Sequence, residues 1–311
     1  MEISIPVRRE KTIFAAQKSN MGSFFSKILF YGVVLPISYL PFTVLYWLAD
    51  FVYYLTYYVV GYRKKIVRNN LRNSFPKLSE DELKKIEKGF YRHFADFLVE
   101  SVKSLTISNK EIVRRCAILN PEVPNKYFEE GRSVMVLCGH YNNWEYYAVG
   151  LAQQMNHKVF AAYQPLKNEF FNGVLLNSRQ RFGIKMMSMK EVPRKLVKTP
   201  KVPTMSIMVN DQSPHAPKKA YWNTFLNQPT GWMTGTERLA SKLDQVVLFG
   251  CIRKRKRGFY EVSFYPITEN PTEVNEGYVL DQHTKYLEMV IAENPEYWLW
   301  SHRRWKHKKP E

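Results

Sequence analysis

Short apolar runs alternate with segments of helical periodicity along most of this chain. The runs that predict buried strands are residues 134–137, 158–162, 204–209, 245–252 and 259–264. Apolar residues recur at helical spacing in residues 170–182, 192–197, 237–243 and 277–293. Strands that alternate with helices predict an α/β fold with a mixed, largely parallel sheet flanked by helices.

One long helix is predicted ahead of the first strand, over residues 78–105. Ser79 and Glu82 match a capping box, and the apolar residues that follow share one helical face. His93 lies within this helix, where packing explains it better than ligand binding. No internal repeat or low-complexity linker interrupts the remainder, so a single catalytic domain is expected.

The N-terminal part has a different composition. Residues 28–60 contain no Lys or Arg, carry Tyr and Trp throughout, and precede the basic cluster 63–65. Their length permits a membrane span, although Pro36, Pro41 and Asp50 interrupt it. We expect one anchor that spans the membrane or is deeply embedded, in preference to an interfacial hairpin, with the basic cluster facing the cytoplasm.

This segment divides the predicted chain into three parts. Residues 1–20 form a polar extension, residues 21–62 a membrane-anchoring helical segment, and residues 63–311 the catalytic domain. The expected location is the inner, cytoplasmic membrane, with the catalytic domain in the cytoplasm. Cys116, Cys138 and Cys251 have neither disulfide nor metal-site spacing, which agrees with a reducing compartment.

Charge narrows the class of partner. The chain carries 46 Lys and Arg against 28 Asp and Glu, a net charge of +18. Such an excess favours anionic partners: a phosphorylated lipid, an acidic membrane surface, an acidic carrier protein or nucleic acid.

Candidate chemistry appears where the first apolar strand ends. Gly139 permits a sharp turn, and His140 then falls at the strand's carboxyl end, where open α/β sheets bind ligands. Glu145 follows in a predicted helix that Asn142 or Asn143 caps. We predict that Glu145 holds one ring nitrogen of His140 while the other accepts a proton from an attacking hydroxyl. The alternative is a structural histidine beside a solvated glutamate.

The segment from His140 to Glu145 resembles the His-x4-Glu box of the glycerolipid-type acyltransferases. Further segments, in the same order, are similar to one branch of them, the bacterial lipid A late acyltransferases. These segments are residues 61–71, 163–171, 179–183, 210–213, 224–227, 234–236 and 294–306. The resemblance covers roughly residues 21–306.

This resemblance implies an activity and its partners. The expected enzyme moves a fatty acyl chain from acyl carrier protein to a hydroxyl of an anionic lipid A precursor at the inner membrane. It needs no metal and no cofactor other than the acyl carrier protein thioester. Acylation of a lysophospholipid or an aminolipid is the alternative. Cys138, two residues from His140, would offer a covalent route, but a thiol inside an apolar strand is typically inert.

The family resemblance implies four more candidate site residues, which would bind the substrate. One of Arg179 and Arg181 is expected to bind a phosphate of the acceptor or of the carrier's prosthetic arm, and Arg181 is preferred because it lies beside Gly183. Asp211 and, more weakly, Gln212 match the family's Asp-Gln segment and are expected to position a substrate hydroxyl or the catalytic loop. The alternatives are solvated helix arginines and an aspartate that forms a turn.

Two basic runs, 253–257 and 302–309, complete the candidates. The first is predicted at the tip of a hairpin at Gly258. Either run could dock an acidic carrier protein or anionic headgroups. A nucleic-acid-binding protein is the alternative from a different class, but it leaves His140 and the apolar N-terminus unexplained, so we expect no nucleic-acid partner. No Gly-rich phosphate loop, zinc-site spacing or G-x-S-x-G elbow is present, which weighs against an ATPase, a metallohydrolase and a serine esterase.

Overall fold

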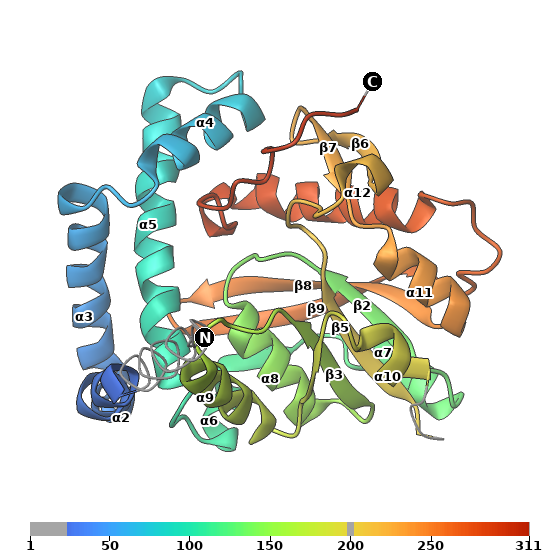
Figure 1. The fold of residues 1–311 in the computed structure, drawn as a ribbon, viewed down its shortest axis with the longest axis horizontal. Helices are drawn as coiled ribbons and strands as arrows, with labels where there is room; N and C mark the ends of the chain where they lie inside the picture. Colours follow the sequence, from blue (N-terminus) through green and yellow to red (C-terminus); the bar gives the residue numbers. More distant parts are fainter. Residues whose placement is uncertain (1–23, 198–201, 311) are drawn as a thin grey trace, which may run out of the picture.

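A seven-stranded sheet forms the centre of the protein (Figure 1). The computed structural model describes residues 24–197 and 202–310. Its strands are β1 (Cys116–Ile118), β2 (Val134–Cys138), β3 (Lys158–Tyr163), β4 (Lys185–Ser188), β5 (Thr204–Val209), β6 (Tyr221–Phe225), β7 (Gln228–Trp232), β8 (Val246–Lys256) and β9 (Phe259–Thr268). The strand order in the sheet is β1-β9-β8-β2-β5-β3-β4, while β6 and β7 form a separate hairpin.

Neighbouring strands of the large sheet run parallel, with the exception of the antiparallel pair β8 and β9. The helices are α2 (Leu35–Tyr39), α3 (Phe42–Tyr54), α4 (Lys64–Ser74), α5 (Glu80–Lys103), α6 (Asn109–Arg115), α7 (Glu122–Glu129), α8 (Trp144–Gln154), α9 (Glu169–Gln180), α10 (Val192–Val197), α11 (Gly235–Leu243) and α12 (Tyr278–Glu293). The predicted mixed, largely parallel sheet flanked by helices is therefore confirmed.

The strands and helices predicted from the apolar pattern are present, with ends that differ by a few residues. The pattern missed β1, β4 and the hairpin of β6 and β7. β1 is only three residues long, and β4, β6 and β7 are partly exposed and mix polar with apolar residues.

The sheet is covered on both faces. Side chains of β2 alternate between two apolar layers: Met135 and Leu137 pack on the side of α12 and the C-terminal segment, while Val134 and Val136 pack on the side of α6, α7 and α8. A strand buried on both faces is apolar at every position, which explains the uninterrupted apolar sequence of β2.

The N-terminal apolar segment forms several short helical pieces. Two π-helical turns, Phe30–Val34 and Leu55–Val59, flank α2 and α3. The chain breaks between α2 and α3 because Leu40, which precedes Pro41, is extended, at φ −58° and ψ 147°. Among the residues with a described structure, no helix has both the length and the apolar character needed to cross a membrane. The predicted polar extension over residues 1–20 lies outside the described residues.

Helix α3 packs lengthwise against α5. Leu45 and Ala49 of α3 are buried against Ala95 and Val99 of α5. The Ser79 capping box predicted for the start of α5 is present. These helices stand beside the carboxyl-terminal end of β8 (Figure 1).

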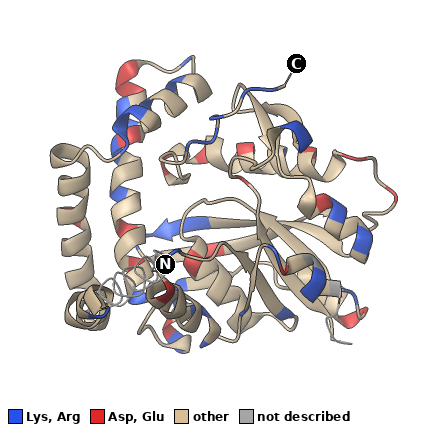
Figure 2. Cartoon of the chain, in the orientation of Figure 1, with Lys and Arg blue, Asp and Glu red and all other residues tan. Residues whose placement is uncertain are grey.

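The basic run at residues 253–257 holds this arrangement together. It lies where β8 ends, and Gly258, at φ +74°, makes the predicted hairpin turn. Lys254 and Arg257 both bond Asp96 of α5, at 3.1 and 2.8 Å, and Arg257 also bonds Asp50 of α3. In Figure 2 the basic end of β8 points toward α5. Much of this positive charge is therefore paired with carboxylates of the protein itself.

Candidate active site

His140 and Asp211 meet at the carboxyl edge of the sheet. Each follows its strand by two residues, His140 after β2 and Asp211 after β5. Because β2 and β5 are parallel neighbours that pair Cys138 with Val209, the two residues are brought side by side. His140 Nδ1 lies 2.5 Å from Asp211 Oδ1, and the backbone N–H of His140 donates to Oδ2 at 2.7 Å.

Gly139 permits this close approach. A Cβ atom at that position would lie 2.7 Å from Leu287 Cδ1 and 3.1 Å from Asp211 Oδ2. A side chain at this position would therefore require the Leu287 side chain to move and the Asp211 carboxylate to shift slightly.

Asp211 is an ionised carboxylate in a buried place. Burial by itself would raise its pKa. The charge of His140, together with hydrogen bonds from His140 and Trp298, more than offsets this and holds the pKa of Asp211 well below its usual range. A buried carboxylate bonded to Nδ1 fixes the imidazole's orientation and tautomer.

Gln212 lies on the opposite side of the ring. Its side-chain nitrogen is 3.3 Å from His140 Nε2. The amide therefore lies at the ring nitrogen that Asp211 does not contact. The sequence prediction placed both Asp211 and Gln212 near the chemistry, and the structure brings both into contact with His140.

The prediction that Glu145 orients His140 is wrong in this structure. Glu145 makes a bidentate ion pair with Arg179 of α9, with Arg179 Nε and an Nη nitrogen donating at 2.9 and 2.6 Å. Glu145 lies in the first turn of α8 and pairs with α9, whereas Asp211 follows β5, the strand next to β2. The carboxylate that contacts His140 thus follows the neighbouring strand and does not belong to the box itself.

Arg181, the arginine preferred from the sequence, and Arg179 have different partners in the structure. An Nη nitrogen of Arg181 donates to the backbone carbonyls of Ser104 and Ile107, at 2.7 and 2.6 Å, and so ties α9 to the end of α5. Arg179 is the member of the pair that contacts Glu145 of the His-x4-Glu box.

Two buried asparagines form the turn between His140 and α8. Asn142 has a left-handed backbone, at φ +52°, and is fully buried. Asn143 is the N-cap, and its side-chain oxygen accepts the Tyr146 N–H at 2.9 Å. An asparagine tolerates the left-handed conformation better than most residues, which explains its place here.

Cys138 is a core residue. Burial, reinforced by the charge of Asp211, raises the pKa of its thiol, so the reactive thiolate is disfavoured. This agrees with an inert thiol at the end of an apolar strand.

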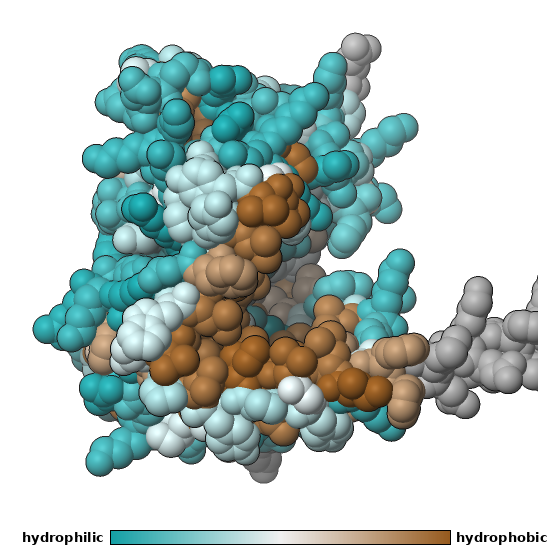
Figure 3. Space-filling view, turned by 90° about the vertical axis from the view of Figure 1, so that its left-hand side faces the viewer, coloured by the Kyte–Doolittle hydropathy of each residue, from teal (hydrophilic) through white to brown (hydrophobic). Residues whose placement is uncertain are grey.

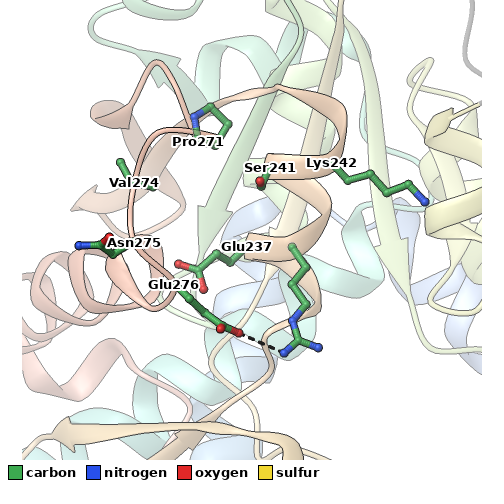
Figure 4. A pocket seen from close by; sticks show the side chains of 8 residues that line it. Glu237, Ser241, Lys242, Pro271, Val274, Asn275 and Glu276 are labelled. Carbon is green, nitrogen blue, oxygen red and sulfur yellow. Dashed lines mark hydrogen bonds and ion pairs between the residues drawn. The ribbon is translucent and has the colours of Figure 1, made fainter.

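A surface pocket of about 460 Å³ lies between α11 and the loop before α12, and none of its lining residues belongs to the His140 site (Figure 4). Glu237 in its wall accepts the Gly277 and Val279 backbone N–H groups and so caps α12. Arg238 and Glu276 form an ion pair at 3.1 Å. In Figure 4 a dashed line leads from Glu276 to its partner. These polar groups serve the fold, which leaves the sheet edge as the candidate site.

Three site residues were outside the sequence prediction. Trp298 and His302 of the C-terminal segment contact the loop after β5, and Glu100 of α5 contacts the loop after β2. The C-terminal motif resembles the family signature, but its contacts depend on tertiary structure. The contact between Asp211 and His140 follows only from the strand order, which places the ends of β2 and β5 together.

An imidazole held by a buried carboxylate at the carboxyl edge of a parallel sheet is an arrangement typical of enzymes that use a general base. The model of the family described as bacterial lipid A biosynthesis acyltransferase matches residues 15–307, and the chain belongs to this family. It is accordingly an acyltransferase of lipid A biosynthesis. A search among curated proteins found no match.

Proposed function

We propose that this acyltransferase moves a fatty acyl group from an acyl carrier protein thioester to a hydroxyl of a lipid A precursor, with His140 as general base. The observation that carries the proposal is the 2.5 Å contact between His140 Nδ1 and Asp211. When Nδ1–H donates to Asp211, Nε2 keeps its lone pair and can accept a proton.

The reaction requires one proton to move twice. The acceptor hydroxyl displaces the Gln212 amide from Nε2 and gives its proton to His140 as its oxygen attacks the thioester carbon. A carbon–oxygen bond forms, and the carbonyl becomes a tetrahedral oxyanion. Collapse breaks the carbon–sulfur bond, and the imidazolium returns the proton to the leaving thiolate. Gln212, once displaced, remains close enough to donate to the acceptor or to the oxyanion.

Glu145 and Arg179 have a second role in this proposal. Their ion pair is only partly exposed, with 13% and 16% of the side chains accessible. A guanidinium held in one orientation by a carboxylate is suited to binding a phosphate of the acceptor or of the carrier's prosthetic arm.

We propose that the C-terminal cations bind the acyl carrier protein. Arg303, Lys306, Lys308 and Lys309 are exposed and follow directly after the residues that contact Asp211 and Ser213. The cations of 253–257 are less suited to this role, since most of them already pair with the protein's own carboxylates. An acidic carrier bound here would approach the site from the C-terminal side.

The membrane contact is assigned to the outer face of α3 and the turn after it. Trp47, Phe51, Tyr54 and Tyr58 recur at helical spacing and are each more than half exposed. Figure 3 shows the apolar surface on this side of the molecule. Trp and Tyr favour the membrane interface, so this stripe suits contact with the inner membrane, with the catalytic domain in the cytoplasm.

Mass spectrometry of the products tests the proposal. Detergent-solubilised protein is mixed with acyl carrier protein thioesters or matched coenzyme A thioesters. The acceptor is an under-acylated lipid A disaccharide, a lysophospholipid or a hydroxylated aminolipid. Acyl addition to the disaccharide from the carrier thioester, released by hydroxylamine as an ester, is expected.

The His140→Ala variant should lose this product, while replacement of the exposed His215 by Ala should retain it. Transfer to the lysophospholipid or the aminolipid alone would overturn the acceptor. Equal use of coenzyme A thioesters would overturn the carrier requirement. Full activity of His140→Ala would overturn the general base.

A further inference from the structure

The C-terminal segment contributes a hydrogen-bond donor to the His140 and Asp211 pair. The indole N–H of Trp298 donates to Asp211 Oδ2 at 2.8 Å. The same oxygen accepts the backbone N–H of His140, while Oδ1 faces His140 Nδ1. Two donors on Oδ2 fix the rotation of the carboxylate, so that Oδ1 points to the imidazole.

Trp298 is itself held in one position. It is 2% exposed, and the rings of Phe225, Trp300 and Trp305 surround it at centroid distances of 5.7, 4.8 and 5.8 Å. An indole with so little freedom holds its N–H in a fixed direction.

Backbone hydrogen bonds on both sides of Trp298 hold the turn between His140 and α8. The Asn142 N–H donates to the Tyr297 carbonyl at 2.9 Å, and the Leu299 N–H donates to the His140 carbonyl at 3.1 Å. Further along, the backbone N–H of Ser213, two residues after Asp211, donates to His302 Nε2 at 3.1 Å. One short segment thus contacts the loops after β2 and after β5.

We propose that Trp298 is a positioning residue for the acyl transfer, acting through Asp211 to hold the His140 imidazole in its reactive orientation. This inference rests on the proposed role of His140 as general base. Trp298 contacts the carboxylate and not the reacting atoms, so its loss should slow the chemical step without weakening substrate binding.

The segment has anchors that do not depend on the indole N–H. Asn70 of α4 donates to the carbonyls of Trp300 and His302, at 2.8 and 3.0 Å. Arg63 donates to the Ser301 carbonyl, and Arg304 to the Gly231 carbonyl. A Trp298→Phe variant should therefore keep the segment in place and remove one donor.

Trp300 supplies a matched control. It is a fully buried indole in the same segment, but its N–H donates to the Pro295 carbonyl at 2.6 Å. Trp298→Phe and Trp300→Phe each exchange a buried indole for a phenyl ring and remove one hydrogen bond. The first alone removes a bond to the carboxylate that holds His140.

Steady-state kinetics of the full chain with carrier thioester and lipid A disaccharide provide the test. We expect Trp298→Phe to lower kcat by about 10-fold or more, with KM within about 2-fold, since a bond to a charged group is lost. Trp300→Phe keeps an aromatic ring next to Trp298 and leaves the bond to Asp211 in place, so kcat should stay within about 2-fold. Thermal melting must first confirm that both variants are folded at the assay temperature.

A double-mutant cycle with Asp211→Asn gives a second readout. If Trp298 acts through the carboxylate, Trp298→Phe should add little to the loss already caused by Asp211→Asn. Equal kcat in the two tryptophan variants, or losses that multiply with Asp211→Asn, would overturn the positioning role. His140→Ala distinguishes the two ideas, because an active His140→Ala contradicts the general base whatever Trp298 does.

Discussion

Glu100 accepts a hydrogen bond from the Asn143 side-chain amide at 2.6 Å in the interior of the protein. The carboxylate is fully buried in α5 and also accepts from the Tyr260 hydroxyl at 2.6 Å. Burial raises the pKa of Glu100, while the bonds from Tyr260 and Asn143 oppose that rise. Since Asn143 caps α8, this carboxylate fixes the start of the helix that follows His140.

Replacing Glu100 by Ala should destabilise the protein by roughly 3 kcal/mol, because it leaves buried donors of Asn143 and Tyr260 unpaired. Tyr46 of α3 would lose its bond to the same carboxylate as well. Glu100→Gln keeps an acceptor oxygen and should cost less than half as much. Denaturant unfolding of both variants checks this, and an alanine variant as stable as the parent would contradict it.

Asp211 and Glu145 should differ sharply in catalysis. Asp211→Asn can no longer hold the correct His140 tautomer and should lower kcat by roughly 10³-fold or more. Glu145→Gln leaves the His140 contacts intact and should mainly raise KM by disturbing Arg179. Initial rates over a range of lipid concentrations separate the two effects. A kcat for Glu145→Gln as low as that for Asp211→Asn would restore Glu145 as the orienting carboxylate.

Residue patterns predicted the elements of the fold but not their neighbours. The apolar run of β2 and the end of that strand at His140 follow from local sequence. Asp211 lies 71 positions further along the chain, and its contact depends on β2 and β5 pairing, which local periodicity does not specify. Local sequence therefore favours Glu145, the carboxylate within the motif, over Asp211, which follows the adjacent strand.

The arginines show the same limit. Its place beside Gly183 favours Arg181 in the sequence, but only the packing of α9 decides which arginine faces α8 and which faces the end of α5. The basic run at 253–257 was correctly predicted at a hairpin tip, yet its pairing with Asp96 and Asp50 could not be read from composition. Charge counts say how many cations exist, not which of them are already paired.

Arg179 and Arg181 should respond differently to truncation. Arg179→Ala should raise KM for the phosphorylated acceptor or the carrier thioester by about 10-fold, because a charge-assisted phosphate contact is lost. Arg181→Ala should lower the melting temperature, because Ser104 and Ile107 lose their donor, and leave KM unchanged. Paired kinetic and melting measurements check both. A larger KM effect in Arg181→Ala would return the phosphate contact to Arg181.

The aromatic stripe on α3 should control membrane binding. Trp47→Glu combined with Phe51→Glu places two charges on the exposed face and should weaken binding to phosphatidylethanolamine and phosphatidylglycerol vesicles by at least about 10-fold. Vesicle flotation measures this. Leu119→Glu, at a position 57% exposed in the loop after β1, is the control for adding charge elsewhere. If the control weakens binding as much as the stripe variant, the membrane contact does not lie on α3.

Acid stability should depend on His283, which is fully buried between the rings of Trp232 and Phe249. Neither of its ring nitrogens has a hydrogen-bond partner. Burial, with a smaller contribution from Arg304, outweighs the attraction of Asp211 and lowers the pKa of His283 from 6.5 to about 4.

The sign of the effect follows from proton binding. Between pH 6.5 and about 4, the unfolded chain takes up a proton at His283 that the folded protein does not. The free energy of unfolding should therefore fall as pH decreases through this window, by up to about 1.4 kcal/mol per pH unit for this one group. The His283→Phe variant lacks this protonation site, so the free energy of unfolding of the variant should depend less steeply on pH.

Unfolding by denaturant at pH 8, 6 and 5 separates the two contributions of His283. The difference between His283→Phe and the parent at pH 8 reports packing alone, because both folded and unfolded His283 are then neutral. The change in that difference from pH 8 to pH 5 measures the effect of His283 protonation in the unfolded chain. Over this range we expect the free energy of unfolding of the variant to rise relative to that of the parent by roughly 2 kcal/mol. A difference that stays constant with pH would mean that His283 also becomes protonated in the folded protein over this range.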